Sequence, residues 1–162
     1  MPPKAQYRDH ANVLGAMTFI SVLEGAGMEV LVASSGMDMA LWKRAGASKV
    51  ATGKFFNLRR FTPGRWEDPS PGGSAAPHWT EFGLFTWLRD LDTRLLRAEG
   101  FLDTTAAASN PYSRAILPML DGEGDSPDKW LSLSWRQYLY EFSRKEAQYS
   151  ADPSLVEREL SE

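Results

Sequence analysis

The first clear hydrophobic pattern lies near the start of the chain. Large apolar residues recur there at three- and four-residue spacing: Val13, Leu14, Met17, Ile20 and Leu23. Asp9 precedes them as a helix-capping residue, and Gly25 and Gly27 follow them as stop signals. The pattern therefore predicts a helix that begins after Asp9 and ends at the glycines.

The most regular stripe of the chain lies near its other end. Its members are Leu131, Trp135, Tyr138 and Phe142, preceded by the helix start signal Ser126-Pro127-Asp128. We expect these four side chains to be buried on one face of a helix that continues to about Tyr149. Because one helix in a small domain does not bury all of its faces, we expect Trp130 or Tyr140 to lie at the surface.

Three further helices are predicted from capping signals. Thr80 precedes a stripe of leucines that ends at Gly100, so we expect a helix from Thr80 to Glu99; the stripe is Leu84, Leu88, Leu91 and Leu95. Asn110-Pro111 begins a short helix, which Pro118 ends or kinks. Asp152-Pro153 begins a last short helix, which we expect to be acidic and frayed.

The region between the first helix and Thr80 follows no single period. Residues 28–33 form an apolar run that fits either a strand or more helix, because a run this short has no diagnostic period. Residues 37–44 indicate a short helix, whereas residues 49–61 fit a hairpin or an irregular arm as well as a helix. Residues 62–78 contain four prolines and three glycines, so we expect a surface loop there.

These patterns predict one domain over residues 1–162 that is mainly α, with about five helices around one core. The alternative is an α+β fold with a small strand element near residues 28–58. Residues 1–8 are expected to form an N-terminal tail, and residues 150–162 an acidic C-terminal tail.

Composition narrows the classes of protein. The chain is 43% hydrophobic and 24% charged, which is typical of globular domains. It contains no cysteine, which excludes disulfides and thiolate zinc sites, and no apolar leader follows Met1. We therefore expect an intracellular protein. Residues 11–33 are long enough to cross a bilayer, but Glu24 and Glu29 make membrane insertion unfavourable.

Candidate metal ligands are few. The two histidines, His10 and His78, have no second histidine or cysteine at ligand spacing. The alternating acidic residues at 121–125 lack the distal glutamate of a calcium-binding loop, and glycine-rich phosphate fingerprints are also missing. We expect no metal and no cofactor.

A serine hydrolase is the third candidate function. Ser34 and Ser35 follow the apolar run at residues 28–33, and His78 with an aspartate such as Asp38 would complete a triad. The glycine pattern of a nucleophile elbow is missing, however. Small residues that close a strand explain the two serines better, so we favour a non-catalytic protein.

The distribution of charge is the strongest functional signal. Between Asp38 and Glu67 there is no acidic residue, but there are seven basic ones: Lys43, Arg44, Lys49, Lys54, Arg59, Arg60 and Arg65. Since the formal net charge of the chain is −3, the residues outside this segment carry −10. Aromatic residues lie within and beside the segment: Trp42, Phe55, Phe56, Phe61 and Trp66. Basic residues neutralise phosphates and aromatic rings stack on bases, so the combination favours nucleic acid.

We therefore expect a non-catalytic subunit of a larger assembly that docks an anionic partner. The residues expected to bind it are Lys43, Arg44, Lys49, Lys54, Phe55, Phe56, Arg59, Arg60, Phe61, Arg65 and Trp66. Its expected partners are other protein subunits and RNA or DNA, with acidic protein or a lipid headgroup as alternatives. In the competing interpretation, the phenylalanines belong to the core and the charges pair with the chain's own acidic helices. The protein would then be an accessory or structural subunit without nucleic-acid contact.

Overall fold

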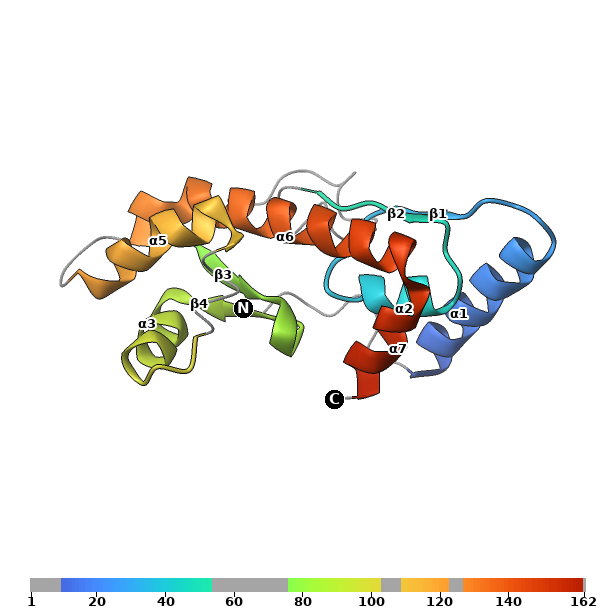
Figure 1. Ribbon diagram of the computed structural model, residues 1–162, viewed down its shortest axis with the longest axis horizontal. Coiled ribbons are helices and arrows are strands. Elements are labelled where there is room, and N and C mark those ends of the chain that lie inside the picture. The colour runs from blue at the N-terminus through green and yellow to red at the C-terminus, as the bar shows by residue number, and fades with distance from the viewer. Residues whose placement is uncertain (1–9, 54–75, 103–108, 123–126, 162) are drawn as a thin grey trace, which may run out of the picture. The chain divides into compact units, whose positions relative to one another are not determined.

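A computed structural model describes residues 10–53, 76–102, 109–122 and 127–161 of the chain (Figure 1). Contacts between residues divide the chain into two compact units. Unit 1 contains Met1–Gly64 and Ser143–Glu162, and unit 2 contains Arg65–Phe142. Units defined by contacts are not necessarily separate folding domains, so the single domain stays a prediction.

The mainly α fold that the sequence predicts is confirmed. The described residues form six α-helices and two sheets of two strands each. The small strand element expected near residues 28–58 is present as β1 (Leu31–Val32) and β2 (Lys49–Val50). The second sheet, in unit 2, has no counterpart in the prediction.

In unit 1, helix α1 (His10–Gly25) begins and ends where the capping and glycine signals predict (Figure 1). The chain reverses after it at Gly27, whose φ of +78° is accessible to glycine without steric penalty. The predicted apolar stripe is only partly covered: Ile20 is buried, but Leu14 is 63% exposed.

The run at residues 28–33 contains the two-residue strand β1 (Leu31–Val32) and no helix. This strand pairs in parallel with β2, with Leu31 opposite Lys49, and helix α2 (Met39–Arg44) lies between the two strands in the sequence. Helix α2 matches the short helix predicted at residues 37–44, and its buried side chains are Met39, Ala40 and Trp42. The chain leaves α2 through Gly46, which has a φ of +99°.

The C-terminal residues of unit 1 are helical and packed. Helix α6 (Leu131–Ala151) ends in this unit, and α7 (Pro153–Ser161) follows directly. Asp152 caps α7, because its Oδ1 accepts a hydrogen bond from Ser154 N at 3.1 Å. Val156 is only 1% exposed, and α7 contacts α2. The last helix is therefore part of the folded unit and not a frayed end.

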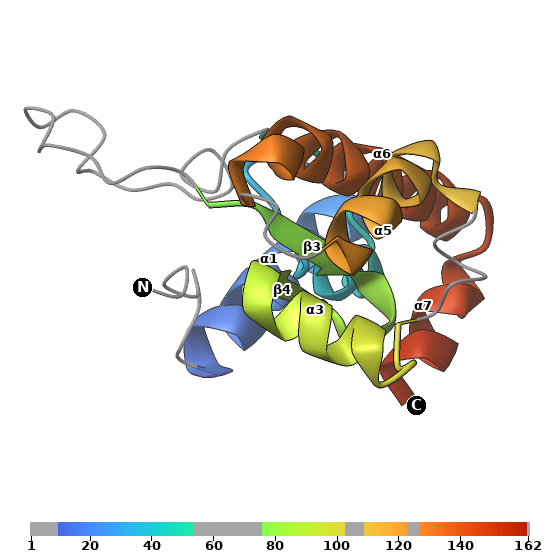
Figure 2. The same cartoon turned by 90° about the vertical axis from the view of Figure 1, so that its left-hand side faces the viewer.

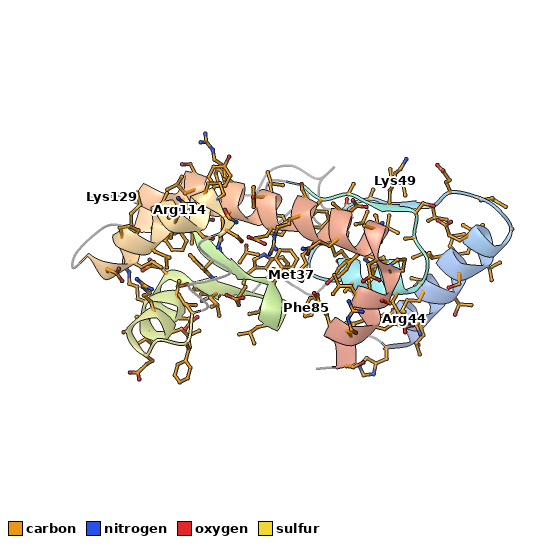
Figure 3. The ribbon with its side chains drawn as sticks, viewed as in Figure 1. Met37, Arg44, Lys49, Phe85, Arg114 and Lys129 are labelled. Carbon is orange, nitrogen blue, oxygen red and sulfur yellow. The ribbon has the colours of Figure 1, made fainter. Side chains whose placement is uncertain are left out.

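In unit 2, the predicted helix from Thr80 to Glu99 is wrong over its first half. Strands β3 (His78–Glu81) and β4 (Thr86–Arg89) form an antiparallel hairpin around the 3₁₀ turn Phe82–Leu84. Only Asp90–Ala98 is helical, as α3. A hairpin is favoured because each strand contains one tryptophan and one threonine, which are common in strands. Phe85 (Figure 3) ends the turn with a left-handed φ of +47°.

The leucine spacing that suggested the helix does not mark a buried face. Leu84, Leu91 and Leu95 are 66%, 68% and 57% exposed. The hairpin lies between α3 on one side and α5 (Pro111–Asp121) with the first part of α6 on the other (Figures 1 and 2). The buried residues of the hairpin strands lie on β3 instead, where Trp79 and Thr80 are both buried.

Side chains of α6 complete the hydrogen bonding of β3. The Gln137 amide accepts a hydrogen bond from Thr80 N at 2.9 Å, and Ser134 Oγ accepts one from His78 N at 3.3 Å. Gln137 is 1% exposed, so the backbone groups of β3 that face away from β4 have partners inside the unit. This closes an edge that would otherwise present free N–H groups.

The buried centre of unit 2 is apolar and contains Trp79, Leu102, Ile116, Leu120 and Trp130. Trp130 ends the 3₁₀ turn Pro127–Trp130 before α6 and is 0% exposed, so its expected place at the surface is wrong. Of the two alternatives, Tyr140 is the exposed residue, at 38%. Asn110 caps α5 as predicted, but Pro118 does not end that helix, which continues to Asp121.

Candidate functional site

Three of the eleven residues predicted to bind a partner are described by the structure, namely Lys43, Arg44 and Lys49, all in unit 1. The other eight lie outside the described residues: Lys54, Phe55, Phe56, Arg59, Arg60, Phe61, Arg65 and Trp66. Most of the predicted surface loop at residues 62–78 also lies outside them.

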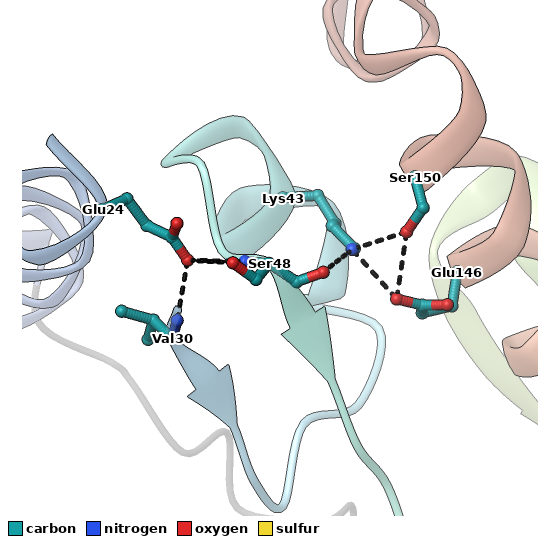
Figure 4. A network of polar contacts seen from close by, with 6 residues as sticks. All are labelled: Glu24, Val30, Lys43, Ser48, Glu146 and Ser150. Carbon is teal, nitrogen blue, oxygen red and sulfur yellow. Dashed lines mark hydrogen bonds and ion pairs between the residues drawn. The ribbon is translucent and has the colours of Figure 1, made fainter. Parts of the chain in front are cut away.

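Lys43 is not a surface residue. Its side chain is 5% exposed, and its Nζ forms an ion pair with Glu146 Oε1 at 2.9 Å (Figure 4). The same Nζ donates to the Ser48 carbonyl at 2.9 Å and to Ser150 Oγ at 2.8 Å. An ammonium has three N–H donors, so these contacts saturate it. Lys43 is therefore a structural cation that joins α2, the start of β2 and α6.

Ser48 connects Lys43 to a second charged group. Glu24 Oε1 accepts hydrogen bonds from Ser48 Oγ at 2.6 Å, Ser48 N at 2.8 Å and Val30 N at 2.8 Å (Figure 4). The Ser48 hydroxyl, followed by the two backbone donors, holds the pKa of Glu24 below its ordinary value. This carboxylate thereby fixes the end of α1 to the starts of β1 and β2.

Arg44 and Lys49 are closer to solvent. Arg44 forms an ion pair of 3.2 Å with Glu157 on α7, but both side chains are more than half exposed. Lys49 is exposed on β2, and its side chain projects away from the ribbon (Figure 3). The exposed basic surface of the described residues in this segment therefore consists of Arg44, with an acidic neighbour, and Lys49.

Two features of the predicted site are thus corrected. Trp42 is 2% exposed, so its ring does not stack on a partner. Lys43 and Arg44 pair with acidic side chains of α6 and α7, which is the internal pairing that the sequence left open for the whole segment. Glu146 and Ser150 are one helical turn apart, so both face the same side of α6 and can receive one cation.

The serines considered for hydrolysis have structural roles. Ser35 is 2% exposed, and its Oγ donates to Asp38 Oδ1 at 3.0 Å. The same carboxylate oxygen accepts from Gly36 N at 2.6 Å, so Asp38 holds the turn between β1 and α2. Ser34, with a φ of +61°, belongs to that turn. A buried hydroxyl with this partner is not an exposed nucleophile.

Acidic side chains in unit 2 also have cationic or polar partners. Arg97 contacts Asp121 through two hydrogen bonds, and this arginine lowers the pKa of the Asp121 carboxyl. Asp90 accepts hydrogen bonds from Arg94 Nε and from Trp130 Nε1, the latter at 3.0 Å. Within the described ranges, no group of three His, Cys, Asp or Glu side chains is placed to hold a metal ion.

A third cluster joins α6 and α7. Glu159 accepts hydrogen bonds from Lys145 Nζ at 2.5 Å and from Tyr149 OH at 2.6 Å. Burial, and then the hydrogen bond to Glu159, raises the pKa of Tyr149. Burial alone would raise the pKa of Glu159, but the bonds from Lys145 and Tyr149 outweigh it and the pKa is lowered. Sequence reasoning missed this cluster, which secures α7.

Comparison with known proteins gives no family: no family model, no curated protein and no solved structure matches the chain. In the part of the chain that the structure describes, no helix has the length and apolar character needed to cross a membrane.

Proposed function

We propose that this protein is a non-catalytic binding subunit that docks an anionic partner, with single-stranded nucleic acid as the favoured partner. The observation that supports it is the distribution of charge. With Lys43 and Arg44 paired internally, five basic residues remain between positions 45 and 66 with no acidic residue among them: Lys49, Lys54, Arg59, Arg60 and Arg65. Since the formal net charge of the whole chain is −3, the residues other than these five carry a net charge of −8.

The residue types in this segment suit phosphate and base recognition. Lysine and arginine neutralise phosphates and release counterions, which gives binding without sequence preference. The interleaved aromatic residues, Phe55, Phe56, Phe61 and Trp66, provide rings on which unpaired bases stack. The segment begins at the exposed Lys49 of β2, and the contacts of Lys43 and Glu24 hold the start of β2 to α1, α2 and α6.

The decisive experiment is the salt dependence of binding to a short labelled oligo-U or oligo-dT, measured by fluorescence anisotropy. Five phosphate contacts should make log K fall with log salt at a slope of about −3.5. An acidic peptide of equal length, poly-glutamate, tests the acidic-protein alternative. Stronger binding to the peptide than to the oligonucleotide would contradict the nucleic-acid proposal.

A matched pair of variants separates the segment from net charge. The double variant Arg59→Glu/Arg60→Glu should lose oligonucleotide binding. The control Arg114→Glu/Arg136→Glu changes the net charge equally, at exposed arginines of α5 and α6, and should retain it. Equal losses in both would show that total charge, and not this segment, controls binding.

A second candidate function is a protein–protein accessory subunit. It is favoured by exposed apolar side chains on and beside α3, where Leu91, Leu95 and Phe101 are 68%, 57% and 74% exposed. Exposed apolar patches of this kind mark protein contacts. In that case a partner subunit that co-purifies with the wild type from the native source would be lost with Leu91→Glu/Leu95→Glu. It would be retained with Arg59→Glu/Arg60→Glu.

A further inference from the structure

Helix α7 lies against basic side chains of two other elements. Glu157 forms an ion pair with Arg44 of α2, which lies beside α7 in Figure 3, and Glu159 forms one with Lys145 of α6. Burial alone would raise the pKa of Glu159, but Lys145 and, to a smaller extent, the charge of Arg144 lower it. Both carboxylates of α7 therefore meet cations of the folded unit. We call these cations the covered basic surface: Arg44, Arg144 and Lys145.

Apolar packing contributes little to holding α7 in place. Within this helix only Val156 is buried, and Leu160 is 42% exposed. A helix of nine residues is shorter than the about 12–15 residues that an isolated helix needs, so α7 depends on its docking contacts. Elements with few buried apolar contacts open at a lower free energy than the core does. Only Asp152 separates α7 from α6, so α7 can move about this residue as one piece.

The ion pair of Lys43 and Glu146 does not share this character. The Lys43 side chain is 5% exposed, and its three donors are all used within the folded unit. Arg44 and Glu157, in contrast, are 53% and 60% exposed, so solvent ions screen this pair and compete with it. Lys145 is more buried than Arg44 and becomes available only when Glu159 leaves with α7.

We propose that α7 is an acidic latch over a second anion-binding surface, formed by Arg44, Arg144 and Lys145, and that single-stranded nucleic acid binds there when α7 is released. The inference rests on the proposed function, because it concerns the same partner. Lys145 Nζ lies 5.6 Å from the centre of the Tyr149 ring, so this surface combines basic and aromatic side chains, as the basic segment does. The carboxylates of α7 occupy the places that phosphates would take.

The latch predicts two states with different numbers of phosphate contacts. With α7 docked, the partner meets the basic residues from Lys49 to Arg65 alone. With α7 released, the covered basic surface adds its own contacts to these. A substitution that favours the released state should therefore increase both the affinity for nucleic acid and the dependence of binding on salt.

The first test removes the two carboxylates from the covered basic surface. For Glu157→Gln/Glu159→Gln, two additional phosphate contacts should steepen the slope of log K against log salt for oligo-dT from about −3.5 to about −4.9. The control Asp92→Asn/Glu99→Gln makes the same change in net charge at exposed carboxylates of unit 2 and should keep the wild-type slope. Adding Arg44→Gln/Lys145→Gln to the first variant should restore the wild-type slope, because the added contacts are lost.

A second variant opens the latch without changing any charge. Val156→Ser removes the one buried apolar side chain of α7 and leaves Glu157 and Glu159 in place. Hydrogen exchange of the α7 amides should become faster in Val156→Ser and in Glu157→Gln/Glu159→Gln, and the salt slope of both should steepen.

The outcomes separate the latch from the proposed function. Fast exchange in α7 together with the wild-type slope overturns the latch and leaves the proposed function in place. A helix α7 that stays protected in both variants also overturns the latch, because contacts other than these then hold the helix. Oligo-dT that binds neither the wild type nor any variant overturns the proposed function together with the latch.

Discussion

Both compact units bury apolar side chains, but unit 1 also contains a lysine that is almost buried and paired with a carboxylate. In unit 2, Trp79 and Trp130 lie in an aromatic and aliphatic cluster, and polar side chains such as Asn110 and Gln137 surround it with paired hydrogen bonds. In unit 1, a lysine lies almost buried among three segments, and its charge is matched by Glu146. Apolar burial tolerates imprecise geometry, whereas a buried ion pair stabilises only when both partners are present.

This difference determines how a substitution lowers the folding stability of each unit. Removing a core side chain in unit 2 loses transfer free energy and leaves a cavity. Removing one charge in unit 1 leaves its partner without compensation in a partly buried place. We rank the effects tested below in this order: a core side chain of unit 2, then the Lys43–Glu146 ion pair of unit 1, then the half-buried hydrogen bonds of Glu24.

The first prediction compares Trp130, just before α6, with Trp135, in the second turn of that helix. Trp130→Ala should lower the free energy of unfolding by roughly 3–5 kcal/mol, because the side chain is 0% exposed and also donates to Asp90. Trp135→Ala should lower it by less than about 2 kcal/mol, because Trp135 is only half-buried. Urea titration of both variants measures the difference. A larger effect at Trp135 would mean that the first turn of α6 is rotated relative to this structure.

Much of this fold is predictable from local signals in the sequence, and the errors of that prediction have physical causes. Helices α5 and α7 begin at capping residues, which act on the next few N–H groups and can therefore be recognised from the local sequence. The hairpin of β3 and β4 was missed because its leucines happen to recur at helical spacing. The tryptophan and threonine residues of the two strands, together with a left-handed Phe85, favour the hairpin instead.

The candidate site was less predictable, because its contacts are distant in the sequence. Lys43 contacts Ser150, which is 107 residues away along the chain, and no local pattern reports such a pair. The run of basic residues is visible in the sequence, but which of them are neutralised internally depends on where α6 and α7 pack. Trp42 illustrates the same point. An aromatic residue beside basic residues suggests a ring that stacks on bases, but Trp42 is buried, and the local sequence does not show this.

The second prediction compares two adjacent basic residues of α2. Lys43→Met should lower the free energy of unfolding by about 1–3 kcal/mol, because Glu146 is left partly buried without its cation. Arg44→Met should lower it by less than ~0.5 kcal/mol, because both partners of the Arg44–Glu157 pair are more than half exposed. Each variant removes one positive charge from the same helix, so net charge is controlled.

The double variant Lys43→Met/Glu146→Gln tests whether the effect arises from this pair. Removing both charges should recover part of the loss, since no uncompensated carboxylate remains. Urea titration of the two single variants and the double variant gives the coupling free energy. A double variant whose loss equals the sum of the two single losses would show that Lys43 acts mainly through Ser48 and Ser150.

The third and smallest expected effect concerns pH and Glu24. Hydrogen bonds from Ser48 and Val30 hold the pKa of Glu24 below its ordinary value in the folded state. A group whose pKa is lowered by folding stabilises the fold above its unfolded pKa, and this contribution is lost as pH falls through the folded value. The pKa values of Asp121, Asp152 and Glu159 are lowered as well, so the stability curve of the wild type reports all four groups.

The informative quantity is the difference in urea midpoint between the wild type and Glu24→Gln. It should be largest near pH 7 and shrink below the ordinary pKa of a glutamate, because protonated Glu24 resembles glutamine. Glu29→Gln, at an exposed position five residues away, is the matched control and should give a small difference. If the Glu24→Gln difference is constant from pH 7 to pH 3, the carboxylate charge does not contribute to anchoring α1, and shape alone holds the end of that helix.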